Sequence, residues 1–265
     1  MRFRLAPYLA YLNIAMAKEA SYRFDVFTSL GSVVVRVYLL ATVWRALYRH
    51  NAAPDGLPLH AILTYATVAL LFGLVMDIDQ SRVLYDRLHD GSIATDFLKP
   101  ISVPLFVFAE GSGEVLFHAI LIVPALVLSL FIVHIDVPSA PVLAMFALSA
   151  LLGYLVGYCI NFLINVTAFW TLEVSAARLI VTYAAELLGG QIIPLVVFPV
   201  ALQKIVFVLP FAAMFSTPLL IYVGRIPPQQ WASAVGVQAL WVVLLAGICA
   251  VLWRAASRRV VVQGG

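Results

Sequence analysis

Residues 86–102 read DRLHDGSIATDFLKPIS, a polar stretch inside a chain that is otherwise strongly apolar. The run AILTYATVALLFGLVM precedes this region at 61–76, and VPLFVFAEGSGEVLFHAILIVPALVLSLFIV follows it at 103–133. Apolar runs of about 20 residues are long enough to cross a bilayer as helices. The pattern therefore predicts two membrane spans joined by a polar segment that lies outside the hydrocarbon.

The composition of the whole chain supports the same class of fold. Of its 265 residues, 63% are hydrophobic and 11% are charged, whereas soluble domains carry about 25% charged residues. We therefore expect an all-α integral membrane protein with one domain over residues 1–265, surrounded by membrane lipid. The net charge of +3 is small and gives no indication of a nucleic-acid partner.

Six apolar runs are long enough to be membrane spans. The predicted spans are residues 26–48, 59–77, 106–133, 141–166, 172–193 and 230–253. Residues 1–22 precede the first span, and an apolar residue recurs there at every third or fourth position, at Leu5, Leu9, Leu12 and Met16. This periodicity predicts a short amphipathic helix at the membrane interface.

The region 194–228, between the fifth and sixth spans, is apolar but interrupted by prolines. These are Pro194, Pro199, Pro210, Pro218, Pro227 and Pro228. Proline breaks the hydrogen-bond ladder of a helix, so the region is too apolar for water and too interrupted to span. We expect short re-entrant helices in the outer leaflet, packed against protein or against a water-filled cavity.

Basic residues indicate how the chain is oriented. With the N-terminus inside, the inner side receives Arg2, Arg4, Lys18, Arg23, Arg82, Arg87, Lys99, Arg254, Arg258 and Arg259. The outer side receives Arg45, Arg49, Lys204 and Arg225. Because basic residues favour the cytoplasmic side, we predict a multi-pass protein of the cell membrane with both termini in the cytoplasm. The segment 79–102 then also lies in the cytoplasm.

The segment 79–102 contains signals for a short amphipathic helix. Leu84 and Leu88 share one helical face. Gly91 follows at the point where a left-handed residue can end a helix, and Pro100 prevents a helix from continuing unbroken into the next span. An ordinary solvated loop with one helical turn accounts for the local pattern equally well.

Several ionisable residues fall inside predicted spans. Glu110, Glu114 and His118 are spaced by four on one helical face, and Arg36 is near the centre of the first span. Such groups are costly in a membrane and usually face a cavity or a partner. One interpretation is a polar substrate path that favours a cationic cargo. Alternatives are an ion pair between Arg36 and a glutamate that joins neighbouring helices, and a proton- or sodium-coupled carrier that uses Glu110 and Glu114.

Small residues in the apolar runs indicate close packing. Ser149, Gly153 and Gly157 form a stripe on the fourth span that lets another helix approach, and we expect this contact within the chain. Cys159 and Cys249 fall inside apolar runs and are interpreted as small buried hydrophobic residues. Neither a disulfide nor a metal site is expected from them.

Two longer motifs resemble a known family. The string LYDRLHDGSIATDFLKPISVPL at 84–105 resembles the G…L…L-[KR]-P signature of ABC-2-type transporter permeases, through Gly91, Leu98, Lys99 and Pro100. The string GGQIIPLVVFPVALQKIVFVLPFAAMFSTPLLIYVG at 189–224 resembles the IPL-x-x-FP…LPF pattern of the daunorubicin-exporter-like branch.

The resemblance implies the membrane subunit of an exporter for an amphipathic or hydrophobic substrate. It further implies two ATP-binding-cassette ATPase subunits and a second permease copy or a paralogue, joined mainly through the first and fifth spans. The helix between the second and third spans would be the coupling helix, with ATPase contacts from Arg82, Val83, Leu84, Asp86, Arg87, Leu88, Gly91, Lys99 and Pro100. The outer gate would be formed by Pro194, Phe198, Pro199, Pro210 and Phe211.

Signatures of catalysis are missing from the sequence. It contains no G-x-x-x-x-G-K-[ST] and no H-E-x-x-H. We therefore expect a non-catalytic chain that holds no cofactor or metal of its own. If transport is driven by ATP, the nucleotide and its Mg²⁺ bind to the partner ATPase.

Overall fold

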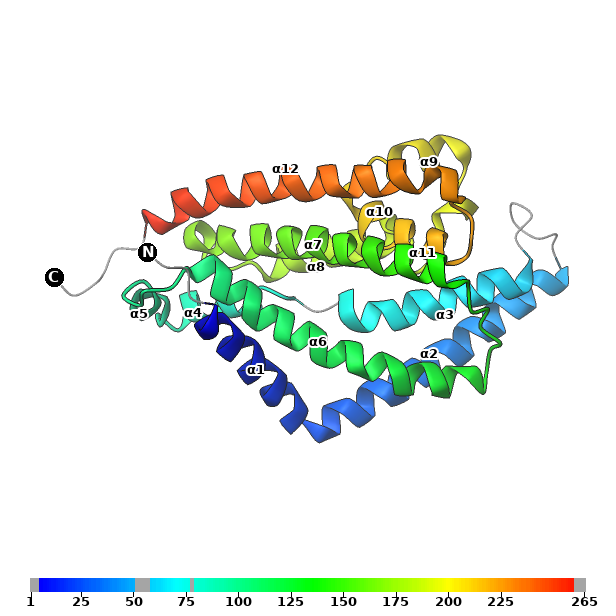
Figure 1. Ribbon diagram of the computed structural model, residues 1–265, viewed down its shortest axis with the longest axis horizontal. Helices are drawn as coiled ribbons and strands as arrows, with labels where there is room; N and C mark the ends of the chain where they lie inside the picture. Colours follow the sequence, from blue (N-terminus) through cyan, green and yellow to red (C-terminus); the bar gives the residue numbers. More distant parts are fainter. Residues whose placement is uncertain (1–4, 51–57, 77–78, 260–265) are drawn as a thin grey trace.

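The computed structural model describes residues 5–50, 58–76 and 79–259, and every regular element there is helical (Figure 1). The α-helices are α1 (Ala6–Ser21), α2 (Arg23–His50), α3 (Leu59–Met76), α4 (Arg82–His89), α5 (Ile93–Asp96), α6 (Val103–Leu130), α7 (Ala140–Thr171), α8 (Ser175–Leu188), α9 (Val200–Val206), α10 (Pro210–Met214), α11 (Ser216–Tyr222) and α12 (Trp231–Ser257). Two 3₁₀ turns, η2 (Leu195–Val197) and η3 (Pro228–Gln230), complete the set. The predicted all-α class is confirmed.

Five of the described helices are long and apolar enough to cross a membrane. They are α2, α3, α6, α7 and α12, and they correspond to five of the six predicted spans. In Figure 1 they extend along the long axis of the molecule, with α4 and α5 at one end. The start of α1 and the end of α12 lie at this same end, which we call the α4–α5 end.

The fifth predicted span, 172–193, requires a correction. Helix α7 continues to Thr171 and ends at Leu172, which has a left-handed backbone with φ of 60°. Helix α8 then covers only 14 residues and ends at Gly189. At 1.5 Å per residue such a helix is about 21 Å long, shorter than a hydrocarbon core of about 30 Å. The prediction of six spanning helices is therefore not confirmed.

Helix α3 lies inside the bundle, packed against α2, α6 and α11. Most of its side chains are buried, including Tyr65 and Phe72. The Phe72 ring meets Phe215 edge-on, with the ring centroids 6.1 Å apart. A helix that is apolar on all sides is expected to be surrounded by other helices, and the sequence of α3 has this character.

The small-residue stripe of α7 packs within the chain, as predicted. Gly153 lies against the backbone carbonyl of Met214, where a Cβ would clash. The Ser149 hydroxyl donates to Gln238 Oε1 at 2.8 Å, and Gln238 Nε2 donates to the Ala213 carbonyl at 2.8 Å. These contacts join α7 to α10 and α12.

Helix α1 packs lengthwise against α6. Gly113 has the Leu12 carbonyl directly against its Cα, and Ala15 is buried in the same contact. Leu5 and Leu9, which were expected on the apolar face, are 63% and 57% exposed. A glycine on α6 thus admits the backbone of α1 near Leu12. Exposed leucines are also what a helix facing lipid would show, so the predicted position of α1 at the membrane interface stays a prediction.

The region 194–228 forms η2, α9, α10 and α11, a series of short helices at the end opposite α4 and α5 (Figure 1). Proline precedes or begins several of them: Pro194 before η2, Pro199 before α9 and Pro210 at the start of α10. Their predicted re-entrant position in an outer leaflet stays a prediction.

Candidate functional site

The segment 79–102, which we call the coupling segment, contains α4 and α5. Helix α4 ends as predicted, because Gly91 has a left-handed φ of 79°. The following turn is held by Asp90, whose Oδ1 accepts a hydrogen bond from the backbone amide of Ser92 at 2.8 Å. Hydrogen bonds from the Ser92 side chain and from its backbone amide hold the pKa of the Asp90 carboxyl below its usual value.

The apolar face of α4 points into the bundle and not into solvent. Leu84 has no exposed surface and packs in one cluster with Phe106 of α6 and Phe162 of α7. On the opposite side, polar side chains are exposed at Arg82, Asp86, His89 and Asp90. Leu98, just after α5, is 81% exposed. The surface that α4 and α5 offer to a partner is therefore mainly polar.

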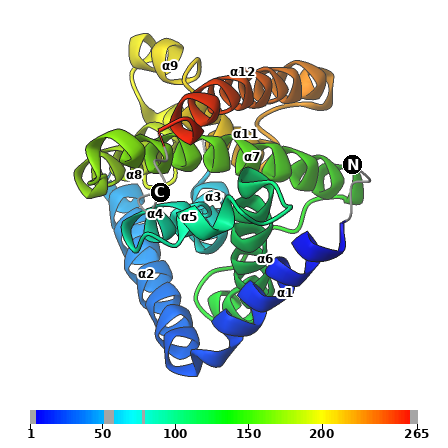
Figure 2. The ribbon, with the colours of Figure 1, turned by 90° about the vertical axis from the view of Figure 1, so that its left-hand side faces the viewer.

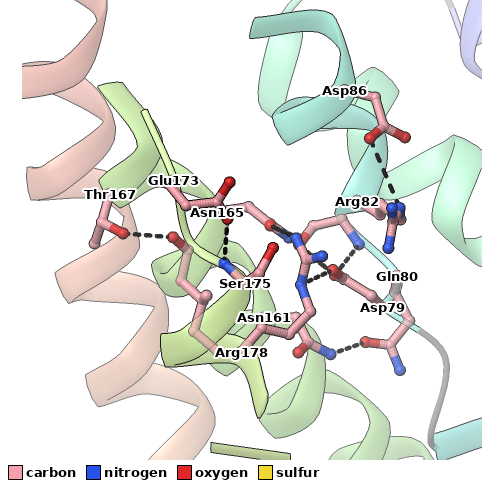
Figure 3. Close-up of polar contacts among 12 residues, drawn as sticks. Asp79, Gln80, Arg82, Asp86, Asn161, Asn165, Thr167, Glu173, Ser175 and Arg178 are labelled. Carbon is pink, nitrogen blue, oxygen red and sulfur yellow. Dashed lines mark hydrogen bonds and ion pairs between the residues drawn. The ribbon is translucent and has the colours of Figure 1, made fainter. Parts of the chain in front are cut away.

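The start of the coupling segment is held by a buried polar group that we call the Asp79 cluster: Asp79, Gln80, Ser81, Asn161, Asn165 and Arg178. Its centre is the ion pair between Arg178 Nε and Asp79 Oδ2, at 2.8 Å (Figure 3). The buried Asn165 amide donates to Asp79 Oδ1 at 2.9 Å and to Ser81 Oγ at 2.8 Å. Arg178 Nη2 in turn donates to Asn165 Oδ1 at 2.7 Å.

The remaining contacts of the cluster extend it to α4. Asn161 Nδ2 donates to Gln80 Oε1 at 2.7 Å. The guanidinium of Arg178 lies 5.3 Å from the ring centroid of Tyr85, and the Tyr85 hydroxyl donates to Glu173 at 3.4 Å. The cluster thus links the coupling segment to α7 and α8 at once.

The charge of Asp79 depends on these partners. Burial raises the pKa of its carboxyl, and Arg178, together with hydrogen bonds from Asn165 and Ser81, opposes the shift. A carboxylate removed from water is stable only when it is paired and hydrogen-bonded, and Arg178 and Asn165 meet this requirement.

A second group, the Arg87 cluster, consists of Arg87, Asp96, Lys99, Phe106 and Glu110. Arg87 Nη1 donates to the two carboxylate oxygens of Asp96 at 3.1 and 3.0 Å. Lys99 Nζ donates to the same carboxylate at 2.7 Å, and Asp96 has no exposed side-chain surface. Arg87 also ion-pairs with Glu110 at 3.5 Å and covers the Phe106 ring at 4.8 Å.

Together the two clusters connect the coupling segment to three helices of the bundle. The Arg87 cluster connects α4 and α5 to α6, and the Asp79 cluster connects the residues before α4 to α7 and α8. Leu84 adds an apolar contact between them. Figure 2 shows α4 and α5 across this end of the bundle, over α3 and beside α6, α7 and α8. Contacts from α4, α5 and the residues before α4 therefore reach α6, α7 and α8 together.

The predicted ATPase contacts fall into two sets. Arg82, Asp86, Gly91, Lys99 and Pro100 are exposed and remain predicted contacts. In the second set, Leu84 is fully buried, Arg87 points to Asp96, and Val83 and Leu88 are half-buried in the core of this end. The second set holds the coupling segment on the bundle.

The predicted substrate-path residues all have partners within the chain. Glu110 pairs with Arg87, and Glu114 lies 3.9 Å from Lys18 of α1. The His118 ring hydrogen-bonds to the Glu114 carbonyl at 2.9 Å. Arg36 is exposed on α2 and interacts electrostatically with Glu186 of α8. A role for these residues in transport stays a prediction.

The predicted outer-gate residues lie among the short helices opposite the coupling segment. Phe211 packs against the main core, while Phe198 packs with Leu195 and Val206 in a separate small cluster. Gln203 Nε2 holds this turn by donating to the Phe198 carbonyl at 2.8 Å. Gating by this region likewise stays a prediction.

The Asp79 cluster was not predicted from the sequence. The signal was present: Asn161 and Asn165 are two amides four residues apart in an apolar span, and polar residues at such positions are seldom without partners. Among the described residues no group of three or more metal-ligating side chains is present.

A family model described as ABC-2 family transporter protein matches residues 18–264. The chain belongs to the ABC-2 transporter family. No curated protein and no solved structure matches the chain. ABC-2 permeases are transmembrane subunits that are not catalytic by themselves, and the family implies an ABC ATPase subunit as partner. With its apolar helices, this ABC-2 chain is a multi-pass membrane protein.

Proposed function

We propose that this chain is the membrane-spanning subunit of an exporter that moves an amphipathic or hydrophobic substrate out of the cytoplasm. Two separate ATPase subunits would supply the energy. The observation that carries the proposal is the attachment of the coupling segment to α6, α7 and α8 through the Asp79 and Arg87 clusters. Family membership supports the same role.

Movement would begin at the exposed side of the coupling segment. Arg82, His89 and Leu98 face away from the bundle and are available to an ATPase subunit. When two ATPase subunits close on ATP, the coupling segments of two permease chains would be displaced, and the attached helices would move as rigid bodies. Because Arg87 is paired with Glu110 of α6 and Asp79 is paired with Arg178 of α8, these two helices would move together with the coupling segment.

The second permease chain would pack on α2 and α8. Both helices expose large apolar side chains, among them Tyr38 and Leu39 on α2 and Ile180 and Tyr183 on α8. The lipid alone could cover these faces, so the support comes from Arg36, an exposed ionisable residue of α2, which interacts electrostatically with Glu186 of α8. An exposed ionisable side chain in a membrane span favours a protein neighbour or a polar cavity.

Two polar surfaces are candidates for the substrate path. One is the predicted group of Glu110, Glu114 and His118. The other is a cavity of about 80 Å³ beside the Asp79 cluster, where Asn161, Arg178 and Glu186 share the lining with apolar side chains. This mixture of charged and apolar surface suits an amphipathic substrate. Because sites for small ligands are about 300–1,000 Å³, the cavity would have to widen during transport.

The test is reconstitution with the ATPase subunit in sealed lipid vesicles. The proposal predicts a stable complex, and transport of a fluorescent amphiphile that requires ATP and stops with a non-hydrolysable analogue. Transport driven by a proton or sodium gradient, without ATP or ATPase, would instead establish the carrier that uses Glu110 and Glu114 and would overturn the proposal.

A further inference from the structure

A groove of about 340 Å³ lies on the bundle between α6 and α12, near the α4–α5 end. Leu105 and Phe108 of α6 form one wall, Ala250 and Arg254 of α12 form the other, and Tyr158 and Phe162 of α7 form the floor. Its size is in the range of sites for small ligands, about 300–1,000 Å³. Arg254 is the one charged residue in the lining.

Aromatic contacts give the groove a firm shape. The rings of Phe108 and Tyr158 meet edge-on, with centroids 4.9 Å apart. Phe162 packs against Trp253 at 6.1 Å, and Trp253 stacks on Phe97 at 5.8 Å. The small side chain of Ala250 leaves the space between these rings open. The groove is therefore formed by several aromatic side chains that pack against one another.

A phospholipid acyl chain suits this groove better than a helix of another subunit does. A helix with its side chains is about 10 Å across, whereas the groove is lined by apolar side chains with one charged residue, Arg254. A single extended acyl chain is much thinner and suits a narrow apolar channel between spanning helices.

The mouth of the groove has the chemistry of a lipid headgroup site. Arg254 is exposed in the last turn of α12, and no carboxylate lines the groove to compete for it. An arginine fork can bind a phosphate through two parallel hydrogen bonds. Trp253 beside it has the side chain that membrane proteins place at the bilayer interface.

We propose that this groove binds an anionic glycerophospholipid, with one acyl chain between α6 and α12 and the phosphate on Arg254. This lipid would lie in the cytoplasmic leaflet. That location rests on the proposed function, whereas the groove and the charge of Arg254 do not depend on it. The bound lipid would join the start of α6, which carries the Arg87 cluster, to the end of α12.

The direct test uses the purified, unmodified chain in vesicles, without the ATPase, so that it is independent of transport. Phosphatidylglycerol with a photoreactive diazirine in one acyl chain is the probe, and phosphatidylcholine with the same chain is its control. We expect phosphatidylglycerol to label peptides that contain 158–162 and 246–254 about tenfold more than phosphatidylcholine, a difference of about 1.4 kcal/mol. Both lipids carry the phosphate, but phosphatidylcholine also carries a choline cation, which cancels the negative charge and is repelled by Arg254.

Two pairs of variants separate the groove from general membrane contact. Ala250→Phe fills the groove, while Val251→Phe places the same ring on a 63% exposed neighbour outside it. Arg254→Gln removes the phosphate ligand, while Arg258→Gln removes an equal charge four residues later, just after the last residue of α12. Labelling should fall with Ala250→Phe and lose its preference for phosphatidylglycerol with Arg254→Gln. The control variants should label as the wild type does.

Three outcomes would overturn the proposal. One is equal labelling of the wild type by the two lipids, and another is labelling that neither Ala250→Phe nor Arg254→Gln changes. The third is cross-linking of Cys249, which lines the groove, to a second copy of the chain in the membrane, which would identify a protein neighbour there. The comparison of the two lipids on the wild-type chain tests the proposal even if a variant fails to fold.

Discussion

Arg178 Nε lies 2.8 Å from Asp79 Oδ2, so α8 is ion-paired to the first residue of the coupling segment. The two residues are 99 positions apart in the sequence. Asn165 of α7 bridges them, since it donates to Asp79 and accepts from Arg178. One buried network therefore fixes where the coupling segment leaves α3 relative to two other helices.

Removal of one partner of this pair should destabilise the protein. Arg178→Gln leaves the Asp79 carboxylate with little solvent and without its ion-pair partner, and breaking a buried pair costs about 3–5 kcal/mol. Asp79→Asn should have an effect of similar size, and the double variant should recover part of the loss. The measurement is the midpoint of thermal unfolding in detergent for the four proteins. Strict additivity of the two single effects would contradict the pairing.

The pH dependence of the Arg178→Gln variant provides a separate prediction. Burial raises the pKa of Asp79, so the folded state binds its proton more tightly than the unfolded state. Stability is then lost as pH rises from the unfolded pKa, about 3.9, to the folded pKa. Without Arg178 the folded pKa rises further, so Arg178→Gln should gain stability, relative to the wild type, when pH is lowered below 7. Asp79→Asn/Arg178→Gln should show no such gain in unfolding midpoints measured across this range.

The Arg87 cluster should require an arginine and not only a positive charge. Arg87 donates to both oxygens of Asp96 and also pairs with Glu110, a geometry that lysine cannot reproduce. We expect Arg87→Lys and Arg87→Gln to lower transport at least tenfold while the ATPase subunit still binds. Lys204→Gln, at an exposed site opposite the coupling segment, is the control. Wild-type transport by Arg87→Lys would show that the geometry is unimportant.

Close backbone contact at Gly111 gives a steric prediction. A Cβ at Gly111 would collide with the backbone carbonyl of Gln80, whereas Gly247 has open space around it. Gly111→Ala should therefore displace the start of the coupling segment and lower both the unfolding midpoint and transport. Gly247→Ala should be neutral or slightly stabilising, because alanine favours a helix by about 1 kcal/mol over glycine. Equal behaviour of the two variants would be evidence against the contact.

Substitutions of Leu84 and Leu98 should affect different properties, stability in one case and binding of the ATPase subunit in the other. Leu84 is fully buried, so Leu84→Ala should cost about 2–5 kcal/mol of stability. Leu98 is 81% exposed, so Leu98→Ala should leave stability unchanged and weaken binding of the ATPase subunit. Unfolding midpoints and binding titrations separate the two effects. A stable Leu84→Ala variant with weakened binding would assign the buried face to the partner instead.

Much of the fold could be predicted because its signals are local. The apolar runs gave five helices within a few residues of their observed bounds, and Gly91 ended α4 where expected. The run 172–193 is less apolar, with charges at Glu173, Arg178 and Glu186, but composition does not reveal that Leu172 adopts a left-handed backbone or that α8 ends at Gly189. Where this run ends as a helix depends on how α8 packs against the short helices that follow, such as α10.

The site was predicted less completely because its residues meet through tertiary structure. Periodicity placed Leu84 and Leu88 on one face, but it did not indicate that this face turns toward α6 and α7. Glu110 was recognised as unusual in a span, yet its partner Arg87 lies 23 positions earlier, in another element. The Asp79 cluster joins three segments that are far apart in the sequence. The spacing of residues along a single sequence does not indicate that such segments lie together in the fold.

The central claim is that the exposed side of α4 and α5 receives the movement of an ATPase subunit. The most direct measurement places a photo-cross-linking amino acid at His89 or Leu98, both exposed at this end, and at Lys204 of α9, exposed at the opposite end. The full complex is irradiated in membranes with and without ATP. We predict cross-links to the ATPase from positions 89 and 98, with yields that change on ATP binding, and none from position 204. Cross-links from position 204, or none from either site on the coupling segment, would contradict the account.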